Sequence, residues 1–147
     1  MEKHDFTAIH YAARHGEVTV LSRLLNWRPE ETVSLLSCVN RNGHTPLHLA
    51  VMYNHADLAA CLIKWRSPME MRDKDGWTPL LLAITKCAIA ACLTLIQFGA
   101  DLHALDLFQR NVLHLAIMHG ALKDEALWKR IREVKQCLSS ILVTQLI

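Results

Sequence analysis

Apolar residues recur along the chain in short runs with helical spacing, and polar turn residues separate the runs. In residues 47–51, an apolar run follows a Thr-Pro pair, and residues 58–63 form a second apolar stripe with i, i+4 spacing. Threonine suits a helix N-cap, and proline is tolerated at the first helical position. Arg41-Asn42-Gly43 before them favours a tight turn with positive φ. The pattern predicts a turn, a short helix, a loop and a second helix.

This pattern occurs four times. The four phrases are TAIHYAARHG, TPLHLAVMYN, TPLLLAITKC and NVLHLAIMHG, which begin at Thr7, Thr45, Thr78 and Asn111. A small residue occupies one equivalent place in each, namely Ala12, Ala50, Ala83 and Ala116. A helix stop follows at Gly16, Asn54, Cys87 and Gly120, of which only the cysteine is unusual in a left-handed conformation. The last two spacings are 33 residues, a period typical of solenoid proteins.

Helices this short are not stable alone, so neighbouring units must bury their apolar stripes against each other. We therefore predict an all-α solenoid of about four turn–helix–loop–helix units, forming a single domain over residues 1–147. The predicted unit boundaries are about 5–40, 41–73, 74–106 and 107–142.

Some segments depart from the regular pattern. Five extra residues fall within 26–40, where Pro29 is expected to begin an extra helical turn that packs Val33, Leu35 and Leu36 inward. In the fourth unit, Gln109-Arg110 and Asn111-Val112 replace the Gly and Thr-Pro of the second and third units, so its leading turn is expected to be irregular.

Beyond Gly120, apolar residues follow steps of 4, 3, 4 and 3, at Leu127, Ile131, Val134, Leu138 and Ile141. This spacing predicts a long C-terminal amphipathic helix within residues 122–147. Two roles remain open for it: an elongated last helix that covers the end of the stack, or a segment that docks a partner.

The repeated phrases resemble the ankyrin repeat over about residues 5–125. The resemblance rests on Gly43-x-Thr45-Pro46-Leu47-His48-Leu49-Ala50, on Gly76-x-Thr78-Pro79-Leu80 and on Gly99-Ala100-Asp101. It implies a curved solenoid with hairpin fingers, a protein–protein interaction function and no catalytic residues. It also implies that His10, His48 and His114 are structural imidazoles near the caps of their own units.

A narrower set of phrases, GxTPLHLA, DxxGWTPL and RNVLHLAIMHG, resembles the cytoplasmic ankyrin region of ankyrin-type transient receptor potential cation channels. That resemblance implies an alternative function as a sensory or gating segment within a longer chain that carries a membrane domain. The two functions are compatible, because the repeats of a channel also bind partners.

Composition excludes several other classes. The net charge of +2, without clustered Lys and Arg outside the C-terminal region, argues against nucleic-acid binding. Five cysteines without CxxC spacing indicate reduced thiols and a cytoplasmic location, or the cytoplasmic side of a membrane protein. Residues 77–100 are apolar except for Lys86, but the repeat places a helix–helix turn at Lys86-Cys87, so no direct membrane insertion is expected.

We expect no enzyme activity, cofactor or metal. The nine histidines have no HExxH or CxxC context, and no nucleophile motif or phosphate-binding loop is present.

In an ankyrin array, the fingertips and the ends of the inner helices face the concave side. The predicted partner-binding residues there are Phe6, Arg14, His15, His44, Met52, Tyr53, Trp77, Thr85, Lys86, Arg110, Met118 and His119. Aromatic, Met and Arg side chains are enriched at interface centres, so we expect a protein partner of acidic or aromatic character.

Overall fold

A computed structural model describes residues 7–134, and within this range all regular elements are helical. The α-helices are α1 (Ala8–His15), α2 (Val18–Trp27), α3 (Thr32–Ser37), α4 (Pro46–Met52), α5 (Ala56–Lys64), α6 (Pro79–Thr85), α7 (Ile89–Gln97) and α8 (Val112–His119). Two 3₁₀ turns, η1 (Pro29–Glu31) and η2 (Ala121–Lys123), join them, and residues 125–134 are also helical.

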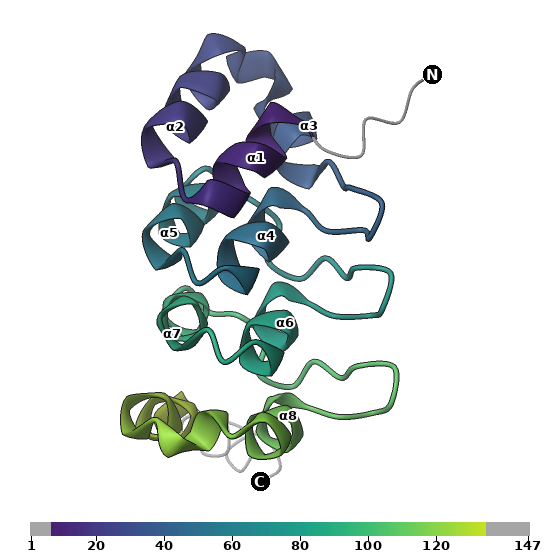
Figure 1. Cartoon of the computed structure of the whole chain (residues 1–147), viewed down its shortest axis with the longest axis vertical. Coiled ribbons are helices and arrows are strands. Elements are labelled where there is room, and N and C mark those ends of the chain that lie inside the picture. Colours follow the sequence, from purple (N-terminus) through teal and green to yellow (C-terminus); the bar gives the residue numbers. More distant parts are fainter. Residues whose placement is uncertain (1–6, 135–147) are drawn as a thin grey trace, which may run out of the picture.

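The helices form two layers of a stack (Figure 1). The inner helices α1, α4, α6 and α8 contact one another in that order, and α2, α5 and α7 form the outer layer behind them. Long loops project from the inner-helix side, roughly perpendicular to the stack. The predicted all-α solenoid is therefore confirmed.

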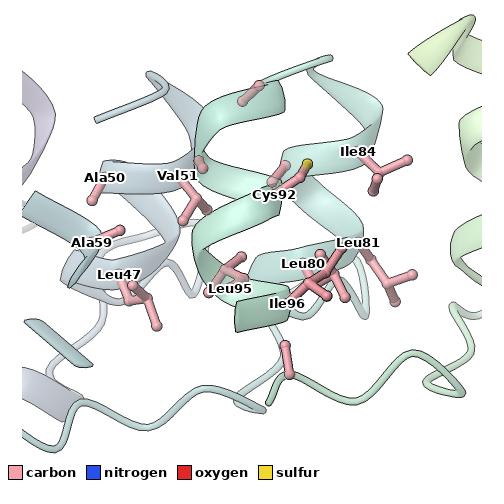
Figure 2. Close-up of a cluster of buried hydrophobic side chains, with 14 of the residues drawn as sticks. Leu47, Ala50, Val51, Ala59, Leu80, Leu81, Ile84, Cys92, Leu95 and Ile96 are labelled. Carbon is pink, nitrogen blue, oxygen red and sulfur yellow. The ribbon is translucent and has the colours of Figure 1, made fainter. Parts of the chain in front are cut away.

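The core runs continuously between the two layers and between neighbouring units (Figure 2). Leu47, Leu80 and Leu95 are fully buried in it. The equivalent alanines Ala50 and Ala83 are also inaccessible, which allows successive inner helices to approach closely. No unit could bury this surface alone, so the stacking supplies the stability that a single hairpin lacks.

The helix starts and stops follow the local chemistry that the sequence predicts. The Thr45 and Thr78 hydroxyls accept hydrogen bonds from the backbone N–H groups of His48 and Leu81, both at 3.3 Å. Cys87 has φ 52° and ends the first helix of its unit, as Gly16, Asn54 and Gly120 do in the other units. The helix break at Lys86-Cys87 is thus confirmed, and no helix within residues 7–134 has the length and apolarity to cross a bilayer.

The insertion between the first two units is helical, but only part of it packs as expected. After η1, helix α3 buries Leu36 completely and Leu35 in part. Val33 is 80% exposed, so the prediction that it packs inward was wrong. The face of α3 that is turned to the core contains Thr32, Leu35 and Leu36, at i, i+3 and i+4, and Val33 lies at the edge of that face.

Three loops, which we call fingers 2, 3 and 4, have the same backbone geometry. They comprise residues 40–44, 73–77 and 106–110. The first residue of each is Asn40, Asp73 or Asp106, whose Oδ1 accepts hydrogen bonds from two backbone N–H groups of its own finger at 2.8–3.0 Å. A backbone hydrogen bond between the first and last residues closes each finger.

Finger 4 is therefore regular, and the expectation of an irregular turn was wrong. Gln109 adopts φ 62° where Gly43 and Gly76 adopt 75° and 79°. The Asp106 carboxylate holds the turn by bonding Phe108 and Arg110, so the backbone keeps the geometry without the glycine.

Replacing Gln109 by glycine is expected to raise the free energy of unfolding by about 0.5–1 kcal/mol, because glycine adopts a left-handed φ without steric cost. Urea denaturation measures the change. As the control, Gly43→Ala should lower stability, since an added Cβ would lie 2.8 Å from the Lys74 backbone nitrogen. A Gln109→Gly chain less stable than the wild type would contradict the assignment of strain.

The C-terminal helix begins as predicted. The Asp124 carboxylate accepts a hydrogen bond from the Leu127 N–H at 2.9 Å, and Leu127 and Ile131 are fully buried. Leu138 and Ile141 lie outside the described residues.

Candidate partner-binding surface

One face of the stack is formed by the fingers and by the C-terminal ends of the inner helices, and we call it the inner face (Figure 1). Phe6, one of the predicted partner-binding residues, lies outside the described residues. Seven of the other predicted residues lie at the ends of inner helices. Met52 is half-buried, and six are exposed, namely Arg14, His15, Tyr53, Lys86, Met118 and His119.

The most developed group on this face joins fingers 3 and 4 to helix α8. The Arg110 guanidinium carbon lies 5.8 Å from the centre of the Trp77 ring and 5.0 Å from that of Phe108. Its Nη1 lies 3.7 Å from the Met118 sulfur. These four residues, which we call the Trp77 cluster, come from three different elements. Such contacts hold two aromatic rings, a guanidinium and a thioether together at the surface.

The buried Asp106 carboxylate also orients the Arg110 side chain. Its Nε donates a hydrogen bond to the Asp106 Oδ2 at 2.7 Å, and the aspartate side chain is almost completely buried. Burial by itself would raise the pKa of Asp106, but hydrogen bonds from Arg110 and Phe108 outweigh it and lower that pKa below its usual value. The carboxylate is thus held ionised, and the position of the guanidinium is set before any partner binds.

A second group lies at the other end of the inner face. The Arg14 guanidinium is 5.5 Å from the centre of the Tyr53 ring, so the ends of α1 and α4 touch across neighbouring units. His15 stacks on Tyr11 with 6.1 Å between ring centres. Three of these four residues were predicted from their repeat position, and Tyr11 was not.

Two predicted residues have partners inside the protein. His44 is 9% exposed, and its Nε2 lies 3.1 Å from the Asp73 Oδ2 of the next finger. Thr85 is half-buried and donates its hydroxyl proton to the Leu82 carbonyl at 2.7 Å. Both side chains thus form hydrogen bonds within the stack.

Two of the repeated histidines, His10 and His48, link the inner helices α1 and α4 to the finger that follows each of them. His48 Nε2 donates to the Trp77 carbonyl at 3.0 Å, while its Nδ1 lies 2.9 Å from the Thr45 hydroxyl. His10 makes the equivalent contacts to the His44 carbonyl and Thr7. A carbonyl only accepts, so Nε2 carries the proton in both rings. The implied role beside the cap is confirmed for His10 and His48, whose rings also bond the next unit. The His114 Nδ1 lies 2.9 Å from the Asn111 Oδ1 at the cap of its own unit.

Acidification is expected to destabilise the fold. Burial lowers the pKa of His10, His44 and His48 in the folded chain. Below about pH 6.5 these histidines therefore bind more protons in the unfolded chain than in the folded chain. The free energy of unfolding that they contribute above that pH is lost as the pH falls. The thermal midpoint, followed by circular dichroism, should decrease continuously between about pH 7 and pH 5.

His48→Leu is the matched control, because unit three carries Leu81 at this position. The variant should be less stable at neutral pH but should show a shallower dependence on pH. A midpoint that does not change between neutral and mildly acidic pH would contradict the assignment of buried neutral imidazoles.

Sequence reasoning missed Phe108 and Leu107, which are 75% and 66% exposed at the tip of finger 4. The signal was available in the repeat register. The same two positions hold Arg41-Asn42 in finger 2 and Lys74-Asp75 in finger 3, so finger 4 alone of these three has an apolar tip.

No group of three or more His, Cys, Asp and Glu side chains within residues 7–134 is arranged to hold a metal ion.

Comparisons with known proteins agree with this geometry. Family models match residues 1–67, as "Ankyrin repeats (3 copies)", and residues 75–107, as "Ankyrin repeat". The chain is 33% identical over 120 residues to "Transient receptor potential cation channel subfamily A member 1" of Drosophila melanogaster. The aligned residues cover 81% of this chain and 10% of the relative.

Two further relatives are "NF-kappa-B inhibitor alpha" of Rattus norvegicus and "Neurogenic locus notch homolog protein 1" of Xenopus laevis. The first is 32% identical, covering 78% of this chain and 38% of the relative. The second is 34% identical, covering 75% of this chain and 4% of the relative. The chain thus spans less than half the length of each of these proteins.

Proposed function

Because the chain belongs to the ankyrin-repeat family, we propose that it is a non-catalytic module that docks a protein partner on its concave inner face. Ankyrin repeats indicate a protein–protein interaction module. The finer assignment, to the fingers and the ends of the inner helices, is carried by the Trp77 cluster. We place the module on the cytoplasmic side of the cell, in keeping with its reduced thiols.

The Trp77 cluster has the chemistry of an interface centre. Interfaces are enriched in aromatic, Met and Arg side chains, and the residues that dominate binding energy are mostly Trp, Tyr and Arg. Phe108 and Met118 are 75% and 60% exposed, so they have apolar surface that a partner would bury. Because Asp106 already holds Arg110 in place, little side-chain entropy would be lost on binding.

Site-specific cross-linking tests this assignment. A photoreactive phenylalanine analogue at Phe108 should attach covalently to a partner protein in cell extract. The same analogue at Trp128, an exposed aromatic residue in the helix of residues 125–134, is the matched control and should not attach to that partner. Equal attachment from both positions, or attachment only from Trp128, would reject the inner face as the docking site.

A second candidate function is a sensory or gating segment of an ankyrin-type transient receptor potential cation channel. It is favoured by the 33% identity to subfamily A member 1 over 81% of this chain. If it is right, the full-length transcript should encode about six downstream apolar spans of about 20 residues each. A complete transcript without such spans would refute the channel assignment and leave the docking module unaffected.

A further inference from the structure

The charges of the inner face are distributed unevenly. The fingers and inner helices, which lie within residues 8–16, 40–54, 73–87 and 106–120, contain the basic residues Arg14, Arg41, Lys74, Lys86 and Arg110. Their carboxylates are Asp73, Asp75 and Asp106. Asp73 and Asp106 are buried and bonded within the stack, to His44 and Arg110 respectively. Asp75 is thus the exposed carboxylate of these segments.

The basic side chains are placed along the first three units. Arg14 is exposed at the end of α1, Lys74 at the tip of finger 3, and Lys86 at the C-cap of α6. Burial is the main cause that lowers the pKa of His44, and the positive charge of Lys86 lowers it further. Lys86 therefore lies within electrostatic range of finger 2, which contains His44. The charge of Arg110, by contrast, is balanced by Asp106.

The outer helices α2, α5 and α7 and the helix of residues 125–134 also contain five basic residues, but three exposed carboxylates accompany them. The basic residues are Arg23, Lys64, Lys129, Arg130 and Arg132, and the carboxylates are Asp57, Glu125 and Glu133. In α5, Asp57 accompanies Lys64, and in residues 125–134 the Arg130 and Glu133 side chains lie 3.7 Å apart. Exposed basic side chains are thus accompanied by fewer exposed carboxylates on the inner face, four to one, than on the outer helices, five to three. The inner face would therefore attract acidic groups and repel basic ones.

The fourth unit contributes exposed apolar side chains at the end of the inner face that follows these basic residues. Leu107 and Phe108 form the tip of finger 4, and Ile117 and Met118 are exposed on the last turn of α8. The Gly76 position allows this tip to lie close to finger 3, because a Cβ there would meet the Leu107 side chain at 2.6 Å. The apolar surface is thus continuous with the Trp77 cluster.

From this arrangement we propose that the docked partner presents an acidic segment next to an apolar anchor. The acidic segment lies along units one to three, where Arg14, Lys74 and Lys86 face it. The anchor, a large aromatic or aliphatic side chain, packs against Phe108 and Met118. This inference rests on the proposed docking function and specifies the chemistry of the partner.

Fluorescence anisotropy with synthetic peptides tests the proposal on the full chain. The probe is a labelled peptide of alternating Glu and Ser followed by Leu-Trp-Leu. It should bind at least about tenfold more tightly than the version with Lys in place of Glu, and than the version with Ser in place of Leu-Trp-Leu. Raising NaCl from about 50 to about 300 mM should weaken its binding several-fold.

Charge-reversal variants locate the effect. Lys74→Glu combined with Lys86→Glu should weaken binding of the Glu peptide by at least about tenfold. The control is Lys64→Glu combined with Lys129→Glu, which changes the net charge equally on outer helices and should alter binding by less than about twofold.

Equal affinity for the Glu and Lys peptides, or an equal loss in both charge-reversed pairs, would overturn the proposal. So would a natural partner, cross-linked through Phe108, whose affinity is unaffected by Lys74→Glu with Lys86→Glu. That last result would leave the inner face standing as a docking site and refute only the acidic character of its partner.

Discussion

Replacing Leu95 by alanine is expected to lower the free energy of unfolding by about 2–5 kcal/mol. Leu95 is fully buried in α7, close to Leu80 and Ile96 in the cluster of Figure 2. Removing three side-chain carbons there loses transfer free energy and leaves a cavity that the stack fills only partly. Domains of this size are stable by about 5–15 kcal/mol, so one substitution would remove a large share of the total.

The effect of Leu95→Ala should reach beyond its own unit. In a solenoid each unit is stable because its neighbours cover it, so loosening the third unit also uncouples the second from the fourth. Urea denaturation followed by circular dichroism measures the change. Gln97→Ala, an exposed substitution in the same helix, is the control and should change stability by less than about 0.5 kcal/mol. Equal stabilities of the two variants would contradict the placement of Leu95 in the core.

Replacing Trp77 and Phe108 together by alanine is expected to weaken partner binding by at least about 2 kcal/mol, or about thirtyfold. Both rings lie beside the Arg110 guanidinium, so their removal eliminates apolar contact area and both aromatic contacts of that guanidinium. The fold should survive, because the hydrogen bond that finger 3 accepts from His48 goes to the Trp77 backbone carbonyl, which alanine retains.

Isothermal titration with the cross-linked partner, once identified, measures this loss. Trp128→Ala, on the outer layer, provides the control and should bind as tightly as the wild type. Phe108→Ala alone separates binding from folding, because this side chain is mostly exposed and contributes little to the core. Unchanged affinity in the double variant would remove the Trp77 cluster from the interface.

Local chemistry made most of the fold predictable. Thr45-Pro46 and Thr78-Pro79 start helices, and Gly16 and Gly120 end them, because capping and positive φ depend on residues adjacent in sequence. The 33-residue period then required equivalent units to stack. These features needed no knowledge of contacts between distant residues.

Local patterns were less informative for irregular segments. Val33 was expected inside because it is apolar, but a helix of six residues has too few turns for spacing alone to choose its buried face. Gln109 was expected to disturb finger 4, but the Asp106 side chain holds the backbone in the same turn. The repeated Asn40, Asp73 and Asp106, 33 residues apart, would have revealed this support.

The candidate binding surface was only partly visible in the sequence. Repeat position alone selected Trp77, Arg110 and Met118, which the structure brings together, but it also selected His44, whose side chain is buried against Asp73. The sequence determined the helices, their order and the fact that they stack, because these follow from nearest neighbours and from periodicity. Only the tertiary structure decided which side chains of the inner face meet and which are buried, because those contacts join residues of different units and depend on how each unit is seated on the next.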